Sequence, residues 1–203
     1  NEVAEPIGGN LDGCRIGFDA GGSDRKVSAV IDGECVYSEE VVWFPKLQAD
    51  PQYHYDGIVA AFKSAASRMP RVDAIGVSSA GVYIDNKCMV ASLFLKVGKD
   101  EFDKKVKNIY TRAAEQLSSQ LGYHIPVVVA NDGDVSALAG AMGLGVGNIM
   151  GIAMGTSEAV GYVDKDKNVL GWINELAFAP VDLCENAMQD EWSTDIGVGC
   201  KYF

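Results

Sequence analysis

The sequence lacks long apolar runs, close cysteine pairs and basic clusters. No stretch approaches the ~20 apolar residues that a membrane-spanning helix needs, and the N-terminus lacks the basic and then apolar layout of a secretion signal. The five cysteines are odd in number and widely spread: Cys14, Cys35, Cys88, Cys184 and Cys200. None belongs to a Cys-x-x-Cys pair, so neither a disulfide framework nor a zinc site is expected. These absences favour a cytoplasmic protein with no membrane partner.

Positive charge and histidine are also scarce. The chain carries 17 Lys and Arg against 28 Asp and Glu, a formal net charge of -11. Such a chain repels a polyanion in any non-specific encounter, and no basic run offsets this, so no nucleic acid partner is expected. His54 and His124 have no carboxylate or cysteine at ligand spacing, and both are expected at the surface rather than as metal ligands.

Apolar residues, in contrast, are plentiful enough for a real core. The chain has 203 residues, 48% of them hydrophobic and 22% charged, which suits one large domain or two small ones.

Residues 1–13 are rich in Gly and acidic residues without periodicity, and we expect a flexible lead-in there. The sequence stops at Phe203 within an apolar stretch that has the look of ordered structure, which indicates a fragment without its C-terminal portion.

Patterns of apolar residues predict the order of the elements. A meander of strands over 15–19, 26–31 and 34–42 is expected, with Asp32-Gly33 as the two-residue turn between the last two. A helix over 53–69 that leads into a buried strand over 74–78 indicates a parallel crossover. Further elements are expected in this order: a helix over 99–121, a strand over 126–130, a helix over 135–142, and strands over 148–154 and 160–163.

The most informative motif follows the first expected strand. Residues 15–23 read Arg-Ile-Gly-Phe-Asp-Ala-Gly-Gly-Ser, an apolar run that ends in Asp19 and continues into a Gly-Gly-hydroxyl turn. Such a turn presents backbone N–H groups and a hydroxyl around one concave point, beside a carboxylate. This arrangement suits a phosphate and its metal ion. Gly-Gly hairpins that hold nothing are also common, so the motif needs its structural context.

Two later segments strengthen this interpretation. The strand over 148–154 leads into Gly155-Thr-Ser157 and a return strand, which echoes the first motif, and two such loops facing each other would make a nucleotide clamp. Asn131 and Asp132 end the apolar strand over 126–130, and open α/β sheets bind ligands at the carboxyl ends of such strands. Asp132 can instead cap the helix that follows, although Asp134 is the better candidate for a plain cap.

The order and spacing of these motifs resemble the actin-like ATPase and sugar kinase superfamily, and within it the ROK family of glucokinases, other hexose kinases and sugar-responsive repressors. The resemblance covers most of residues 14–200 and rests on four segments: 19–23, 75–81, 127–132 and 155–157. It implies an α/β, ribonuclease H-like fold with two domains around a cleft. The N-terminal domain would span 14–131, and the C-terminal domain would begin at 132 and be truncated at 203.

The resemblance also implies a role for each matching residue. Asp132 matches the general base that takes the proton from a sugar hydroxyl, and Asp19 would position Mg²⁺ through water. The phosphates of ATP would be bound by N–H and hydroxyl donors of Gly21, Gly22, Ser23, Gly155, Thr156 and Ser157. The sugar would contact Ser79, Gly81, Asn131 and Glu175.

Several positions depart from the family pattern. A sugar-binding His and a Gly of the family fall at Phe178 and Ala177, which favours a sugar other than glucose. Glu158 follows the second phosphate loop, where its carboxylate would weaken triphosphate binding unless it points away or faces a metal ion. Asp24 follows the first turn, where the family often has Lys, so one positive charge is lost. The family's zinc cluster survives only as Gly199-Cys200, so no structural zinc is expected.

The sequence therefore predicts an ATP- and Mg²⁺-dependent sugar kinase of ROK type that acts on a hydroxyl of a hexose or hexosamine. Two alternatives stay open: a member of the same fold that binds sugar or nucleotide without turnover, and an actin-like ATPase. The repressor branch is disfavoured, because only about a dozen residues precede the first expected strand, too few for a helix-turn-helix domain. The identity of the sugar, the hydroxyl that is phosphorylated and the formation of a homodimer are left open.

Overall fold

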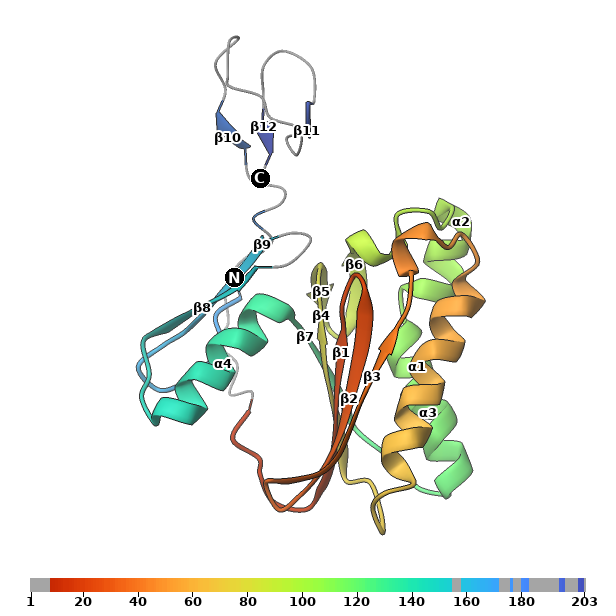
Figure 1. Cartoon of the computed structure of the whole chain (residues 1–203), viewed down its shortest axis with the longest axis vertical. Helices are drawn as coiled ribbons and strands as arrows, with labels where there is room; N and C mark the ends of the chain where they lie inside the picture. Colours follow the sequence, from red (N-terminus) through yellow and green to blue (C-terminus); the bar gives the residue numbers. More distant parts are fainter. Residues whose placement is uncertain are drawn as a thin grey trace. The chain divides into compact units, whose positions relative to one another are not determined.

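The computed structural model describes residues 8–154, 158–171 and 176, together with the backbone of three short strands, β10 (Pro180–Asp182), β11 (Thr194–Asp195) and β12 (Lys201–Tyr202). The chain divides into two compact units, Gly8–Asp132 and the part from Gly133 onward (Figure 1). That these units are the two domains of a kinase stays a prediction. No helix in the described part of the chain has the length and apolarity to cross a membrane.

A five-stranded mixed sheet with the order β3-β2-β1-β4-β7 forms the centre of the first unit. Its strands are β1 (Cys14–Ala20), β2 (Asp24–Ile31), β3 (Glu34–Val42), β4 (Ala74–Ser79) and β7 (Val127–Asn131). The first three form an antiparallel meander, and β4 and β7 run parallel to β1. Asp32 and Gly33 have positive φ angles of 49° and 84°, as a type I′ turn requires. The predicted meander, turn and parallel crossover into β4 are thus confirmed.

Helices α1 (Pro51–Ala66) and α3 (Ile109–Leu121) cover one face of this sheet (Figure 1). Asp50 caps α1 by accepting the N–H of Gln52, and proline occupies the first helical position. Alternate β1 residues, including Ile16 and Phe18, face the helices, and the rings of Phe18 and Phe62 meet edge to face with centroids 5.5 Å apart. The core therefore lies between the sheet and the helix pair.

The helix expected over 99–121 is interrupted. It consists of α2 (Lys99–Glu101), a π-helical turn η3 (Phe102–Val106) and α3. The carbonyl oxygen of Lys107 accepts the N–H of Cys88 at 2.9 Å instead of continuing the helical ladder. The break is therefore caused by a contact with a distant strand, which the helical spacing of apolar residues does not reveal.

The strand that forms this contact belongs to a hairpin missed by the sequence analysis. It consists of β5 (Val82–Ile84) and β6 (Lys87–Val90), and the turn residues Asp85 and Asn86 have φ angles of 51° and 62°. Short 3₁₀ turns, η1 (Pro45–Leu47) and η2 (Ser92–Phe94), complete the unit. Asp and Asn tolerate positive φ angles, so an Asp-Asn pair between two short apolar runs is compatible with such a turn.

His54 is fully buried, so its predicted place at the surface was wrong. Its Nε2 lies 3.0 Å from the carbonyl oxygen of Pro45, and its Nδ1 lies 3.3 Å from that of Asp50. The ring of Phe94 packs against it with centroids 5.0 Å apart. The histidine thereby joins the start of α1 to η1 and η2 within the core.

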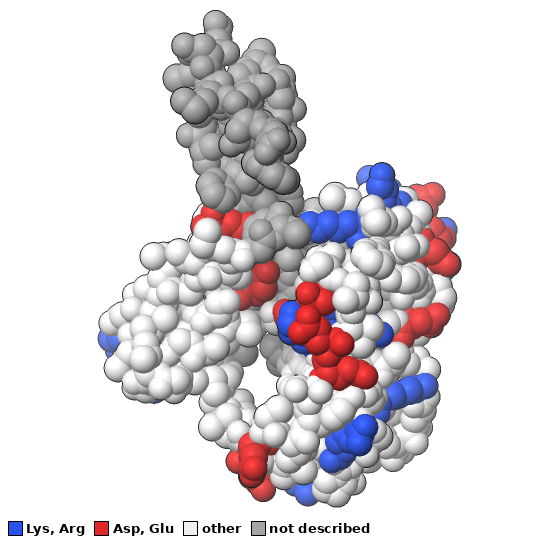
Figure 2. Space-filling view, in the orientation of Figure 1, with Lys and Arg blue, Asp and Glu red and all other residues white. Residues whose placement is uncertain are grey.

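The second unit contains α4 (Asp132–Leu144) apart from its first residue, and this helix packs on a hairpin of β8 (Ile149–Met154) and β9 (Glu158–Val163). Glycines allow this packing, since a Cβ at Gly151 would lie 2.6 Å from the Cα of Ala137. The helix starts earlier than predicted, so Asp134 lies in its first turn and is not the cap. Met150, Ile152 and Met154 are exposed, and few charged side chains are seen on the face of this unit that Figure 2 draws.

Candidate functional site

The carboxyl ends of β1, β4 and β7 meet at one edge of the sheet in the first unit. In the strand register Asp19 pairs with Ser78, and Ser79 pairs with Asn131. The Gly21–Ser23 turn follows β1, Gly81 follows β4 and Asp132 follows β7. Ligands of open α/β sheets bind at such an edge. The fold therefore brings together predicted site residues from three distant segments of the chain.

The other predicted residues lie outside the described part of the chain. They are Gly155, Thr156 and Ser157 of the second phosphate loop and Glu175 of the sugar site, together with Ala177 and Phe178, where the sequence departs from the family. Their roles stay predictions. Glu158 is described and half-buried, and it begins β9 opposite Met154.

Hydrogen bonds to its carbonyl oxygens hold the Gly21–Ser23 turn in place. The buried indole of Trp43 donates from Nε1 to the carbonyl oxygen of Gly21 at 2.8 Å, and the backbone N–H of Trp43 donates to that of Ser23 at 3.1 Å. A Cβ at Gly21 would lie 2.7 Å from the carbonyl oxygen of Asp24, so glycine is required there. Within the described residues, the N–H groups of this turn have no hydrogen-bond acceptor. They are available to an anion.

An ion pair lies beside this turn. The carboxylate of Asp24 accepts a hydrogen bond from the Ser23 hydroxyl at 3.0 Å and another from the ammonium group of Lys26. The hydrogen bond from Lys26 lowers the pKa of Asp24, and the same bond raises the pKa of Lys26. Lys26 also sits opposite Asp19 on β1 and Glu40 on β3 in the strand register.

Lys26 supplies a positive charge that the sequence analysis missed. Asp24, where the family often has Lys, was expected to remove one positive charge from the neighbourhood of the turn, but Lys26 lies two residues further along the same strand. Residues i and i+2 of a strand share one face. The spacing of Asp24 and Lys26 after a Gly-Gly-Ser turn was the signal that would have revealed the pair.

Gly81 and Asn131 fasten the loop after β4 to the end of β7. The side-chain amide of Asn131 donates to the carbonyl oxygen of Gly81 at 2.9 Å, and Asn131 is buried. Gly81 has a φ of 122°, and a Cβ there would lie 2.6 Å from the Cβ of Ala91 and would collide with the carbonyl oxygen of Val90. Only glycine fits this position without strain. The loop is therefore held in one conformation next to Asp132.

Ser79 has a structural set of partners. It is fully buried, and its hydroxyl lies 2.7 Å from the hydroxyl of Tyr83 and 2.9 Å from that of Tyr110. Burial raises the pKa of both tyrosines and raises that of the nearby Cys88 thiol to about 12, so the cluster is uncharged at neutral pH. The Ser79 hydroxyl therefore supports the loop that carries Gly81. Ser79 lies on the same face of β4 as the buried Ile75 and Val77, and this alternation in the sequence was the signal for its burial.

Asp132 is half-buried and is the first residue of α4, directly after the last residue of β7. The N-terminus of a helix carries a partial positive charge that stabilises a carboxylate in its ionised form. An ionised carboxylate is what a general base requires. The position thus suits the predicted catalytic role. The alternative role as the cap residue does not fit, because Asp132 is already the first residue of the helix.

Asp19 fits the kind of magnesium site that phosphate-transferring proteins use. The described residues contain no group of three or more His, Cys, Asp or Glu side chains that could hold a metal ion. Mg²⁺ commonly keeps several waters and is bound by one or two carboxylates and substrate phosphates. Asp19 is half-buried at the end of β1, next to the Gly21–Ser23 turn, and so can supply one such carboxylate.

Solved structures share this arrangement of elements. The chain aligns with the inorganic polyphosphate/ATP-glucomannokinase of Arthrobacter sp. strain KM at 24% identity and a TM-score of 0.60, covering 84% of this chain and 65% of that one. It aligns with the ROK hexokinase of Thermus thermophilus at 16% identity and a TM-score of 0.58, covering 92% and 57%. The chain has the fold of these sugar kinases. The predicted α/β fold class is thereby confirmed.

The same fold also occurs in a regulator. A ROK family transcriptional regulator, a homologue of the E. coli MLC protein, aligns at 19% identity and a TM-score of 0.59, covering 85% of this chain and 43% of that one. The chain thus spans between 43% and 65% of the length of these three proteins. No protein-family model and no curated protein matches the sequence.

Proposed function

We propose that the protein is an ATP- and Mg²⁺-dependent sugar kinase that transfers the γ-phosphoryl group of ATP to a hydroxyl of a hexose or hexosamine. The observation that carries the proposal is the meeting of Asp19, the Gly21–Ser23 turn, Gly81, Asn131 and Asp132 at one sheet edge. The sugar kinases that share the fold support it further.

In this proposal each group at the edge has a separate task. Asp132 accepts the proton of the sugar hydroxyl as its oxygen bonds to the γ-phosphorus, while the bond from phosphorus to the leaving ADP oxygen breaks. The N–H groups of the Gly21–Ser23 turn bind phosphate oxygens. Asp19 would hold a hydrated magnesium ion, which would neutralise charge on the phosphates. Asn131 and Gly81 keep the loop beside the sugar in place.

A second candidate function is binding of sugar or nucleotide without turnover. Glu158 favours it, because this carboxylate follows directly on the predicted second phosphate loop, where negative charge opposes a triphosphate. A transcriptional regulator of the ROK family has the same fold, so the fold is not restricted to kinases.

The test is a coupled assay of ADP release by the full-length protein with ATP, Mg²⁺ and a panel of hexoses, aminosugars and N-acetylated sugars. Turnover that requires one sugar is the expected result and identifies the substrate. Thermal stabilisation by a sugar or by ADP without turnover would favour the second candidate. ATP hydrolysis that no sugar stimulates, together with ATP-dependent sedimentation, would favour the actin-like alternative.

A further inference from the structure

The Ser23 hydroxyl and the Lys26 ammonium group, at the Gly21–Ser23 turn, already donate hydrogen bonds to a carboxylate of the same chain. The Asp24 carboxylate accepts from the Ser23 hydroxyl at 3.0 Å and from the Lys26 ammonium group. Both are donors that a phosphate at this turn would use. The carboxylate and a phosphate oxygen therefore have the same preferred partners.

The ion pair is accessible to solvent. The side chain of Lys26 is 49% exposed and that of Asp24 is 22% exposed. Exposed ion pairs contribute little to the stability of a fold, so the pair can open without unfolding its surroundings. A phosphate, which carries more charge than a carboxylate, can then replace Asp24 as the partner of the Lys26 ammonium group.

The neighbouring arginine cannot replace Lys26. Arg25 lies between Asp24 and Lys26 and so faces the opposite side of the sheet. Its guanidinium group donates to the carbonyl oxygen of Gly57 at 3.2 Å and stands 6.0 Å from the centroid of the Trp43 ring. Arg25 thus joins β2 to α1, and Lys26, which pairs with Asp19 in the strand register, is the cation beside the turn on the face that carries Asp19.

We propose that Lys26 is the phosphate-binding cation of the Gly21–Ser23 turn, and that Asp24 competes with the nucleotide phosphate for Lys26 and for the Ser23 hydroxyl. Asp24 then lowers the affinity for nucleotide, and binding requires Lys26 to exchange one anion for another. The inference rests on the proposed function, because it takes the turn to be a nucleotide phosphate site.

The experiment measures the affinity of the full-length protein for ADP and ATP by titration calorimetry, with and without Mg²⁺. Asp24→Asn frees Lys26 and is expected to tighten binding about two- to fivefold, the range of exposed ion-pair energies. Lys26→Gln removes a charged hydrogen bond and is expected to weaken binding about tenfold or more. In the Lys26→Gln background the gain from Asp24→Asn should be smaller than in the wild type, because only the Ser23 hydroxyl is then freed.

Matched controls separate this effect from net charge. Asp103→Asn and Lys104→Gln change the charge by the same amounts at exposed positions of the η3 turn. Both should leave nucleotide affinity unchanged. Thermal unfolding of every variant verifies that the fold is intact.

The outcomes distinguish the inference from the proposed function. If the wild-type protein binds ADP but Asp24→Asn leaves the affinity unchanged or weakens it, the competition is refuted and the kinase proposal stands. Weakening only when Mg²⁺ is present would refute it by making Asp24 a metal-facing group. If neither the wild-type protein nor Asp24→Asn binds ADP or ATP, both proposals are overturned.

Discussion

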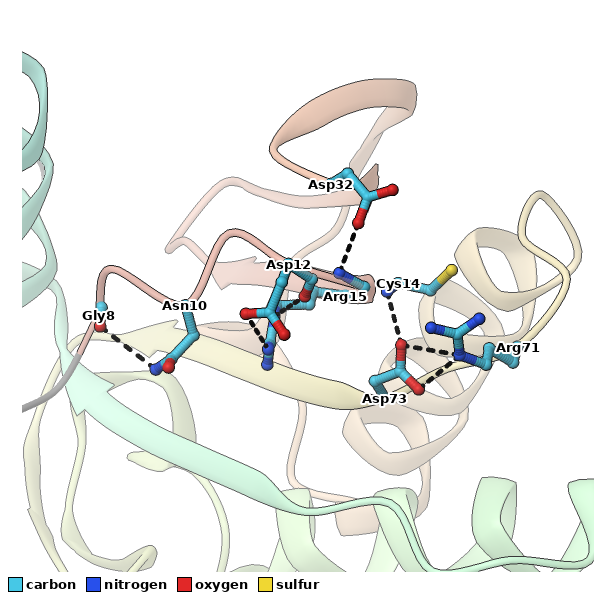
Figure 3. A network of polar contacts seen from close by, with 9 residues as sticks. Gly8, Asn10, Asp12, Cys14, Arg15, Asp32, Arg71 and Asp73 are labelled. Atoms are coloured by element: carbon cyan, nitrogen blue, oxygen red, sulfur yellow. Dashed lines mark hydrogen bonds and ion pairs between the residues drawn. The ribbon is translucent and has the colours of Figure 1, made fainter.

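The sheet of the first unit has carboxylates at both ends, and their partners differ. At the end where β1 and β4 begin, Asp32 accepts the N–H of Gly13 at 2.7 Å, and Asp73 accepts the N–H of Cys14 at 2.7 Å (Figure 3). Asp73 also accepts from the guanidinium group of Arg71 at 2.8 Å. Here carboxylates and backbone donors pair within the chain.

At the opposite end, the backbone donors of the Gly21–Ser23 turn have no acceptor among the described residues. Among the described residues, Asp24 there accepts only from side-chain donors, in an ion pair that is accessible to solvent. Backbone donors that the chain satisfies itself stabilise the fold, whereas donors left open can serve a ligand. We therefore expect the end where β1 and β4 begin to contribute to stability and the end with the Gly21–Ser23 turn to bind ligand. Substitutions at the two ends should separate these effects.

The largest effect is expected at Asp132. Asp132→Asn removes the proposed base and should lower the rate of phosphoryl transfer about 100- to 10,000-fold, while sugar binding persists. Single-turnover rates and sugar titrations measure the two quantities. Asp134→Asn, in the same first turn of α4, is the matched control and should retain activity. Equal loss of sugar binding and turnover in Asp132→Asn would show that Asp132 is structural.

The next effect is expected at Gly81, where the ligand end of the sheet depends on a rigid loop. Gly81→Ala places a Cβ against Val90 and Ala91 at a φ of 122° and should lower the free energy of unfolding by about 2–4 kcal/mol. Gly76→Ala is the control, since a Cβ on β4 at that position meets no atom within 4 Å. Urea denaturation compares them. A similar loss in both variants would remove the special role of the Gly81 conformation.

A smaller effect, on stability alone, is expected at the end of the sheet where β1 and β4 begin. Asp73→Asn loses the charged partner of Arg71 and weakens the acceptor for the Cys14 N–H, so the melting temperature should fall while nucleotide affinity stays unchanged. Asp12→Asn, whose side chain is 87% exposed in its pair with Arg15, should have less effect. A change in nucleotide affinity for Asp73→Asn would falsify the division of roles between the two ends.

The Asp73 effect should depend on pH. The hydrogen bond from Arg71, followed by that from the Cys14 N–H, holds the pKa of Asp73 below its ordinary value of 3.8. A lowered pKa in the folded state stabilises the protein above the ordinary value, and this contribution disappears as the pH falls through the folded-state pKa. Unfolding curves of the wild type and Asp73→Asn should therefore converge below about pH 3.8 and differ most near neutral pH.

Much of the first unit could be predicted from local patterns. Alternation and apolar runs were enough for β1 to β4 and β7, and the Asp32-Gly33 pair was enough for its turn. The parallel crossover into β4 followed from a helix between two strands. The meeting of Asp19, Asn131 and Asp132 at one edge then followed from the parallel direction of their strands.

Other features depend on partners far away in the chain. The helix break at Lys107 comes from its bond to Cys88, and the burial of His54 comes from carbonyl groups of η1 and η2. Ser79 was predicted as a sugar contact, but its hydroxyl is engaged by Tyr83 and Tyr110. Sequence spacing carries no information on such partners.

The sequence by itself determined the strands, the tight turns and the polar residues that end the strands, because backbone periodicity and turn chemistry act over a few neighbouring residues. The tertiary structure decided which of those polar groups are used internally and which stay open to a ligand. Asp73 has a partner within the chain, because the pairing of β1 with β4 brings the Cys14 N–H to its carboxylate. Trp43 donates to the carbonyl oxygens of Gly21 and Ser23, so the N–H groups of that turn stay available to a ligand. Hydrogen bonds depend on proximity in space, and only the folded chain creates that proximity.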